Sequence, residues 1–457
     1  MLPRTIEDSI KATLLLGYRY LWIDAFCIKQ DDAEDKHRQI QQMDLIYTSA
    51  VLTLIAAAGS DPSYGLPGVS NARKMKYRDT SIGKVCVSFT PGDVYNAVAD
   101  SLWFTRGWTF QEGYVSRRRL YFTESGILFI CSESAEDEHF YRDPDSPYGF
   151  ELEGTLDSRA VGITDDGSYG LIEIMQLLEQ YMRRQLSYEN DVSNAIVGVL
   201  NYHRQKNPSI GTVCGLPYQK SVAGLDVICM NWTHDRPATR RLGYPSWSPF
   251  GWIGSIKFSP ILYQLRPSEE DAAGISCHLR DECVDWSHPE SSQYLQITVN
   301  VHRLPVVNLI RSDLEDLDGV LSEHPKTVLV IPQLDTKVDY GGRNYYMDIK
   351  WDVIPPDHYD STRVTCAVIH NHDLKFRWLM ILQDYGTHYE RIGIASFDDP
   401  SPENVMSASG FDELASTTNG LPTLRPGHKR KFFWSRSWAA WHLDWLLQTR
   451  KVTIALG

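Results

Sequence analysis

Asp24, Cys27 and Gln30 are three chemically useful side chains that follow a short apolar segment at residues 20–23. We expect that segment to be a strand, because it is rich in aromatic and aliphatic residues and is bounded by glycine and polar residues. Ligands of open α/β sheets collect beyond the carboxyl ends of the strands, so all three side chains are candidates for binding or catalysis. The simpler interpretation is that Asp24 caps a turn and that Cys27 packs as a small core residue.

Glu34 begins a predicted helix over residues 34–49. An acid in a first turn is stabilised by the helix dipole, which accounts for Glu34 without any catalytic role. Met43, Ile46 and Tyr47 form an apolar face at helical spacing. Together with the strand at 20–23 and a buried strand predicted over 51–57, this helix predicts a βαβ unit and an α/β fold.

A second block holds Arg106, Trp108, Gln111 and Glu112. A guanidinium group beside an indole suits a phosphate or a carboxylate, because arginine makes bidentate contacts and stacks on rings. An ion pair between Arg106 and Glu112 is the structural alternative. Both interpretations remain open on the sequence.

These segments occur in a fixed order as WIDAFCIKQDD, QQMDLIYTSA, VLTLIAAAG and RGWTFQEGYVSRRRLYF. With them, roughly the first third of the chain resembles the fungal heterokaryon incompatibility (HET) domain family. The resemblance implies non-self recognition and programmed cell death in a fungus. Family members usually carry an upstream strand of the type LSYCWG, whereas this chain begins at the following helix, so we expect the sheet to lack its first strand.

The resemblance also implies an enzymatic hypothesis, through a distant similarity of HET domains to TIR domains, some of which cleave NAD. The sheet would then be parallel and TIR-like or Rossmann-like, with NAD as a substrate and with no cofactor or metal. The catalytic residues would be Glu34 and Asp24, and the substrate-binding residues would be Cys27, Gln30, Arg106, Trp108, Gln111 and Glu112. A third hypothesis is an inactive HET paralogue that serves as an interaction scaffold.

The composition disfavours two classes of protein, general nucleic-acid binders and membrane-spanning proteins. Among 457 residues, Asp and Glu outnumber Lys and Arg by 58 to 45, a net charge of −13 that disfavours general binding to nucleic acid. The chain has no apolar run near the roughly 20 residues that a membrane span needs, so we expect no transmembrane segment and a cytoplasmic location. A protein partner or self-association is expected.

We divide the chain into three regions. Residues 1–135 form the HET-like α/β domain, which we expect to begin with a helix after Thr5 as its N-cap and to hold a hairpin of strands at 120–122 and 127–131. Residues 136–240 hold an acidic linker and a helical segment, with helices predicted over 171–186 and 191–202. Residues 241–457 are β-rich, with strands at 294–301, 326–331, 363–369 and 378–382, and end in a helix with Trp434, Trp438, Trp441 and Trp445 on one stripe. That stripe packs against the β-rich region or contacts a membrane surface.

Overall fold

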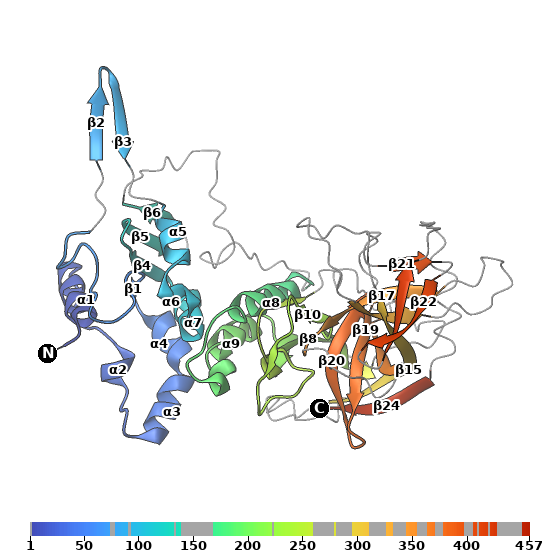
Figure 1. Ribbon diagram of the computed structural model, residues 1–457. Helices are drawn as coiled ribbons and strands as arrows, with labels where there is room; N and C mark the ends of the chain where they lie inside the picture. Colours follow the sequence, from blue (N-terminus) through green and yellow to red (C-terminus); the bar gives the residue numbers. More distant parts are fainter. Residues whose placement is uncertain are drawn as a thin grey trace. The chain divides into compact units, whose positions relative to one another are not determined.

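The computed structural model divides the chain into two compact units, Met1–Pro208 and Ser209–Gly457, each described by itself (Figure 1). The first unit is mixed α/β and the second is β-rich. The structure describes residues 2–73, 78–89, 93–131, 134–138, 168–221, 224–258, 278–279, 295–309, 326–331, 344–353, 363–370, 378–396, 405–408, 411–418, 421–426 and 450–457.

The first unit is built on a mixed sheet with the strand order β1-β4-β5-β6. Strand β1 (Thr53–Ala56) runs parallel to β4 (Arg118–Phe122), which pairs antiparallel with β5 (Ile127–Cys131). Strand β6 (Ala135–Asp137) closes the meander. The predicted hairpin is confirmed, and Thr123 N donates to Gly126 O at its turn.

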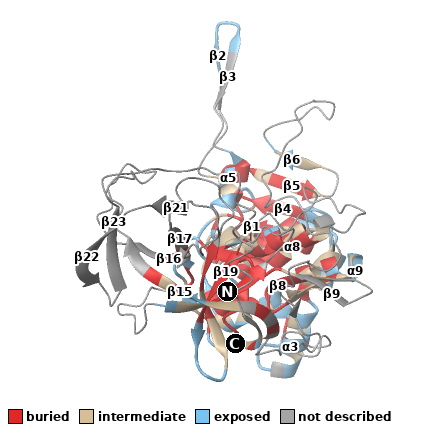
Figure 2. Cartoon of the chain, turned by 90° about the vertical axis from the view of Figure 1, so that its right-hand side faces the viewer, coloured by how far each residue is buried: buried red, intermediate tan, exposed pale blue. Residues whose placement is uncertain are grey.

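Both faces of this sheet are covered, as expected for a buried strand of an α/β unit. Ile55, Tyr121 and Leu128 pack with the helices α5 (Val94–Ala99) and α6 (Leu102–Thr105) on one face. Phe122 packs on the opposite face with Ala12 of helix α1 (Arg4–Leu15). Figure 2 shows the resulting buried residues along β4 and β5.

The predicted strand at residues 20–23 is not formed. These residues have no regular structure, and the Tyr20 side chain is 87% exposed. Within the described residues β1 pairs only with β4, so it is an edge strand and the expected βαβ unit is absent. Aromatic residues favour a strand only where a neighbouring strand can pair with them, and residues 20–23 have none.

Two helix boundaries also differ from the prediction. The helix predicted over 34–49 is split at Gln42 into α3 (Ala33–Gln41) and α4 (Met43–Ser49), because Gln42 leaves helical geometry at φ −109° and ψ 8°. Helix α1 begins after Pro3, whose fixed φ suits a helix start, instead of after Thr5. The Thr5 hydroxyl instead accepts a hydrogen bond from Gly65 N.

The first unit has further helices, two of them before residue 116 and the others after residue 167. Helix α2 (Asp24–Cys27) is a single turn, and α7 (Gly107–Val115) precedes β4. The helices predicted over 171–186 and 191–202 are present with shifted ends, as α8 (Ser168–Tyr181), η1 (Glu189–Val192) and α9 (Val197–Lys206). A separate hairpin joins β2 (Arg78–Ile82) and β3 (Val85–Phe89).

The second unit is dominated by strands, as predicted, and most of their pairings are antiparallel. Strands β15, β16, β17, β20, β19 and β18 pair in a closed ring, to which β24 adds along the first half of β15. Their bounds are Leu295–Leu309, Lys326–Ile331, Asn344–Trp351, Tyr389–Ser396, Trp378–Asp384 and Arg363–His370, with β24 at Arg450–Leu456.

The other elements of the second unit are short. Strands β7 (Ile210–Val213), β8 (Leu216–Ser221) and β9 (Gly224–Ile228) form a meander. The rest are β10 (Trp232–His234), β11 (Thr239–Arg240), η2 (Pro249–Gly251), β12 (Trp252–Ile253), β13 (Ile256–Phe258), β14 (His278–Leu279), β21 (Val405–Ala408), β22 (Phe411–Thr418) and β23 (Leu421–Pro426).

Two predictions concern membranes, and the described residues bear on only one of them. No helix in the described ranges is long and apolar enough to cross a membrane. The stripe of Trp434, Trp438, Trp441 and Trp445 lies outside the described residues, so its helix stays a prediction.

Candidate functional site

Helices α4 and α7 pack against each other and bring Tyr47 and Glu112 into contact. The Tyr47 hydroxyl donates a hydrogen bond to the Glu112 carboxyl. Glu112 is half-buried on α7, and the charge of Asp24, at the first residue of α2, acts on both side chains. The site therefore draws on three short elements of the first unit.

Burial raises the pKa of Glu112 to about 7, and the nearby negative charge of Asp24 adds to the shift. The charges of Arg106 and Arg184 and the Tyr47 hydrogen bond oppose it. An acid that titrates near neutral pH can serve both as a proton donor and as a proton acceptor. The pKa of Tyr47 is raised, first by burial and then by the charges of Glu112 and Asp24, so its hydroxyl stays protonated.

Arg106 supplies the positive charge at the exposed side of this cluster. It is the residue that precedes α7, and its own side chain is exposed. Its charge lowers the pKa of both Glu112 and Tyr47, which places the guanidinium within electrostatic range of the two. An exposed guanidinium beside a carboxyl that is easily protonated offers a binding site for an anionic group.

Arg184 lies near the site, with its guanidinium over the rings of Phe104 and Phe110. Its guanidinium carbon is 4.4 Å from the Phe104 ring centre and 4.8 Å from that of Phe110. Nη1 donates to Arg106 O and to Thr109 Oγ1, both at 3.3 Å. Burial lowers the pKa of Arg184 to about 10, so it remains charged at neutral pH. Arg184 therefore fixes the start of α7 while contributing charge near Glu112.

The predicted residues of the first loop serve local structure. Asp24 Oδ1 accepts from Ala25 N at 2.6 Å, whereas the N-cap residue of α2 is Ile23, with no side-chain cap hydrogen bond. Gln30 Nε2 donates to Asp24 O at 3.3 Å and to Ile28 O at 3.2 Å. The exposed Cys27 Sγ accepts from Ile23 N at 3.4 Å. Asp24 alone among the three also contributes its charge to the Glu112 cluster.

Glu34 is exposed in the first turn of α3, where the helix is capped by Asp32, whose Oδ1 accepts from Asp35 N at 3.0 Å. The charges that shift the pKa of Glu112 come from Asp24, Arg106 and Arg184, and Glu34 is not among them. The two predicted catalytic acids, Glu34 and Asp24, are thus placed in different surroundings.

Trp108 and Gln111 point from α7 toward the later helices of the same unit. Trp108 Nε1 donates to Asp191 Oδ2 at 3.3 Å. Gln111 is 1% exposed, and its Oε1 accepts from Gly198 N at 2.7 Å, at the start of α9. The structure therefore gives both side chains contacts that hold α7 in place.

Tyr47, Trp22 and Arg184 are members of this region that the sequence did not mark as functional. Trp22 meets the Tyr47 ring edge-on, with ring centres 5.8 Å apart. Tyr47 fits the apolar face of its helix, so periodicity alone assigns it to the core. The available signal was the position of Tyr47 within the ordered block QQMDLIYTSA.

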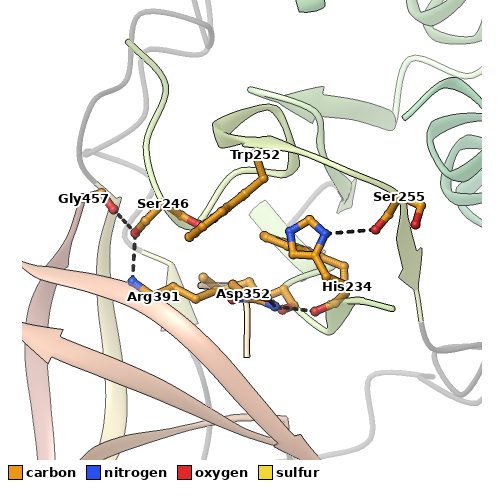
Figure 3. A network of polar contacts seen from close by, with 9 residues as sticks. His234, Ser246, Trp252, Ser255, Asp352, Arg391 and Gly457 are labelled. Carbon is orange, nitrogen blue, oxygen red and sulfur yellow. Dashed lines mark hydrogen bonds and ion pairs between the residues drawn. The ribbon is translucent and has the colours of Figure 1, made fainter. Parts of the chain in front are cut away.

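The second unit holds a buried polar network around Arg391 (Figure 3). Arg391 Nε donates to Asp352 Oδ2 at 2.7 Å, and both side chains are 0% exposed. The guanidinium also donates to the carbonyls of Met230 and Trp232 and lies 3.5 Å from the Trp232 ring centre. Because its donors are directed to protein carbonyls and one carboxylate, Arg391 stabilises the packing of β10 against β17 and β20.

Ser246 extends this network through the segment PSWSPFGWIG. Its hydroxyl accepts from Arg391 N at 2.8 Å and donates to Gly457 O, as the dashed lines of Figure 3 show. His234 Nδ1 lies 2.9 Å from Ser255 O, and burial lowers the pKa of this imidazole. These contacts make the network a structural centre of the second unit.

The comparisons with known proteins bear on the first unit. Residues 1–112 match the family model described as "Heterokaryon incompatibility protein (HET)". No curated protein and no solved structure matches the chain. The matched residues include Asp24, Tyr47, Arg106 and Glu112, so the family segment contains the main part of the cluster. Residues 1–112 of this chain therefore match the heterokaryon incompatibility (HET) domain family.

Proposed function

We propose that this chain is a cytoplasmic signalling protein of fungal non-self recognition, whose HET domain triggers regulated cell death. The observation that carries the proposal is the cluster of Glu112, Tyr47, Asp24 and Arg106 within the matched segment. Carboxyls with strongly raised pKa values concentrate at functional sites. The β-rich second unit then recognises a partner or regulates the first.

Expression in a fungal host tests this proposal. We expect expression of the wild type to reduce growth and viability, and we expect Glu112→Gln and Arg106→Gln to restore them at equal protein levels. Glu136→Gln, on the exposed surface of β6, is the matched control and should remain toxic. Normal growth with the wild type at high expression would contradict the signalling role.

A second candidate function is hydrolysis of a nucleotide cofactor, with NAD as the substrate and a TIR-like active site. The raised pKa of Glu112 favours this residue over Glu34 as the acid. In cleavage of the N-glycosidic bond, a carboxylate stabilises the oxocarbenium-like charge on the ribose while nicotinamide leaves and water adds to the sugar. Arg106 would bind the pyrophosphate, and Glu112 in its ionised form would stabilise the ribose charge and then accept the proton that the attacking water loses.

Measuring nicotinamide release from NAD by the purified full chain tests whether Glu112 or Glu34 is the catalytic residue. If the candidate is right, Glu112→Gln should lose at least 100-fold of the rate, whereas Glu34→Gln should stay within about three-fold of the wild type. The opposite ranking would restore Glu34 as the catalytic acid. Absence of release from folded wild type at high concentration would leave a signalling module or an inactive interaction scaffold.

A further inference from the structure

Tyr114, His203 and Glu173 form a buried polar cluster outside the site described above. The Tyr114 hydroxyl lies 2.7 Å from His203 Nε2, and His203 Nδ1 lies 3.6 Å from Glu173 Oε1. Tyr114 also donates a hydrogen bond to Glu173. Each residue comes from a different helix, namely α7, α9 and α8, so the cluster ties three helices together.

Among the described residues, the titratable and charged groups outside the cluster that act on it come from helix α9. Lys206 and Tyr202 of α9 are its neighbours, and the Lys206 ammonium lies 4.2 Å from the Tyr202 ring centre. Glu173 and His203 are only 3% and 7% exposed. Solvent therefore screens a change of charge at these two side chains only weakly, and such a change alters the packing of the helices.

Helix α7 is the element that both clusters share. Glu112 lies on it two residues before Tyr114, and Gln111 anchors it to Gly198 N. Glu173 and His203 lie beyond residue 112, where the family match ends. A change in how α8 and α9 hold α7 is thus a change in how Glu112 is held.

We propose that Tyr114, His203 and Glu173 form a proton-sensitive latch that fastens α7 to α8 and α9 and loosens when Glu173 ionises. Regulation through this latch does not depend on which reaction or signal Glu112 serves. The latch gives the segment after the family match a defined role, since it positions the helix that carries the site.

The two acid–base groups of the latch respond to pH in opposite directions. Burial raises the pKa of Glu173 to about 7, so its contribution to stability is full below its unfolded value of 4.5 and is lost as the pH rises through 7. Burial, followed by the charge of Lys206, lowers the pKa of His203 to about 4, so its contribution is gained between pH 4 and 6.5. The two contributions offset each other between pH 4.5 and 6.5.

Thermal unfolding of the full chain from pH 4.5 to 7 tests the latch through single and double variants. Relative to wild type, the melting temperature of Glu173→Gln should shift upward as the pH rises, and that of His203→Gln should shift downward. The difference in melting temperature between the double variant and wild type should stay constant up to pH 6.5. Glu136→Gln, at an exposed position of β6, should run parallel to wild type. Parallel curves for both latch variants would overturn the proposal.

A second measurement needs no destabilising substitution. In ¹⁵N-labelled wild type, the His203 ring should remain neutral at pH 5, and hydrogen exchange of α7 amides, corrected for intrinsic rates, should accelerate at least three-fold from pH 6 to 8. Glu173→Gln should abolish that acceleration. A His203 ring that is protonated at pH 6, or α7 exchange that is indifferent to pH, would contradict the latch. Neither readout requires activity, so both remain valid if the proposed function fails.

Discussion

The hydroxyl of Tyr47 donates to the carboxyl of Glu112 across the packed helices α4 and α7. This contact joins two segments that are far apart in the chain, and it lies where burial, Asp24, Arg106 and Arg184 all act on the same carboxyl. The hydrogen bond favours the ionised form of Glu112, while burial and Asp24 favour the protonated form. Their balance leaves the carboxyl ready to exchange a proton near neutral pH.

Removing the titration of Glu112 should change how stability depends on pH. Since its pKa is raised from 4.5 to about 7, its contribution is present below pH 4.5 and lost as the pH rises through 7. Loss over that window is at most about 3 kcal/mol. Glu112→Gln should therefore gain stability relative to wild type from pH 5 to 8 in urea unfolding. A constant difference across this range would show that Glu112 titrates normally.

The partners of Glu112 should move its pKa in opposite directions. Tyr47→Phe removes a hydrogen bond to the carboxylate and should raise the pKa further, by about 0.5–1 unit if the bond contributes about 1 kcal/mol. Asp24→Asn removes a negative charge and should lower the pKa. Carbon-13 spectra of labelled Glu112 measure both shifts. Shifts of the same sign in the two variants would refute the arrangement.

Residue patterns predicted the strands of this protein better than its helix boundaries. Strands β5 and β16 have the bounds expected from their aliphatic and β-branched runs. The segment at 20–23 has a similar composition but pairs with no strand, although one side of β1 is unpaired among the described residues. A segment with strand propensity forms a strand only where another strand pairs with it, and a local sequence pattern does not show whether such a strand is present.

The candidate site was also predictable only in part. Asp24, Arg106 and Glu112 lie in the ordered blocks of the family, so their residue types drew attention. Arg184 was not predicted as a site residue, because its contact with Arg106 O spans 78 residues of sequence. Trp108 and Gln111 were predicted to bind substrate, but their hydrogen bonds to Asp191 and Gly198 depend on how η1 and α9 pack, which no local pattern specifies.

Gly198 should resist substitution because α4, α7 and α9 meet at its backbone. A Cβ atom there would lie 2.4 Å from Asp44 Cβ and 2.7 Å from Gln111 Oε1. Gly198→Ala should cost about 1–3 kcal/mol through overpacking, against the usual gain of alanine in a helix. Gln205→Ala, at an exposed position of α9, is the control and should stay within about 0.5 kcal/mol. Thermal unfolding compares the two, and equal stability would mean that these helices are further apart.

The ion pair of Arg391 and Asp352 should be the most sensitive charged contact of the second unit. Asp352→Asn leaves a fully buried guanidinium without its counter-charge and should cost about 3–5 kcal/mol. Local hydrogen exchange in β17 and β20 measures the loss. The double variant Arg391→Met, Asp352→Leu should recover much of it, because no uncompensated charge then remains buried.

The exposed pair of Lys257 and Asp235 supplies the control for this experiment. Its N–O distance is 3.2 Å, but the side chains are 56% and 49% exposed. Water screens such a pair, so Asp235→Asn should cost less than about 1 kcal/mol. If Asp352→Asn were as mild as Asp235→Asn, the Arg391 guanidinium would have to reach solvent, and the carbonyls of Met230 and Trp232 would not be its partners.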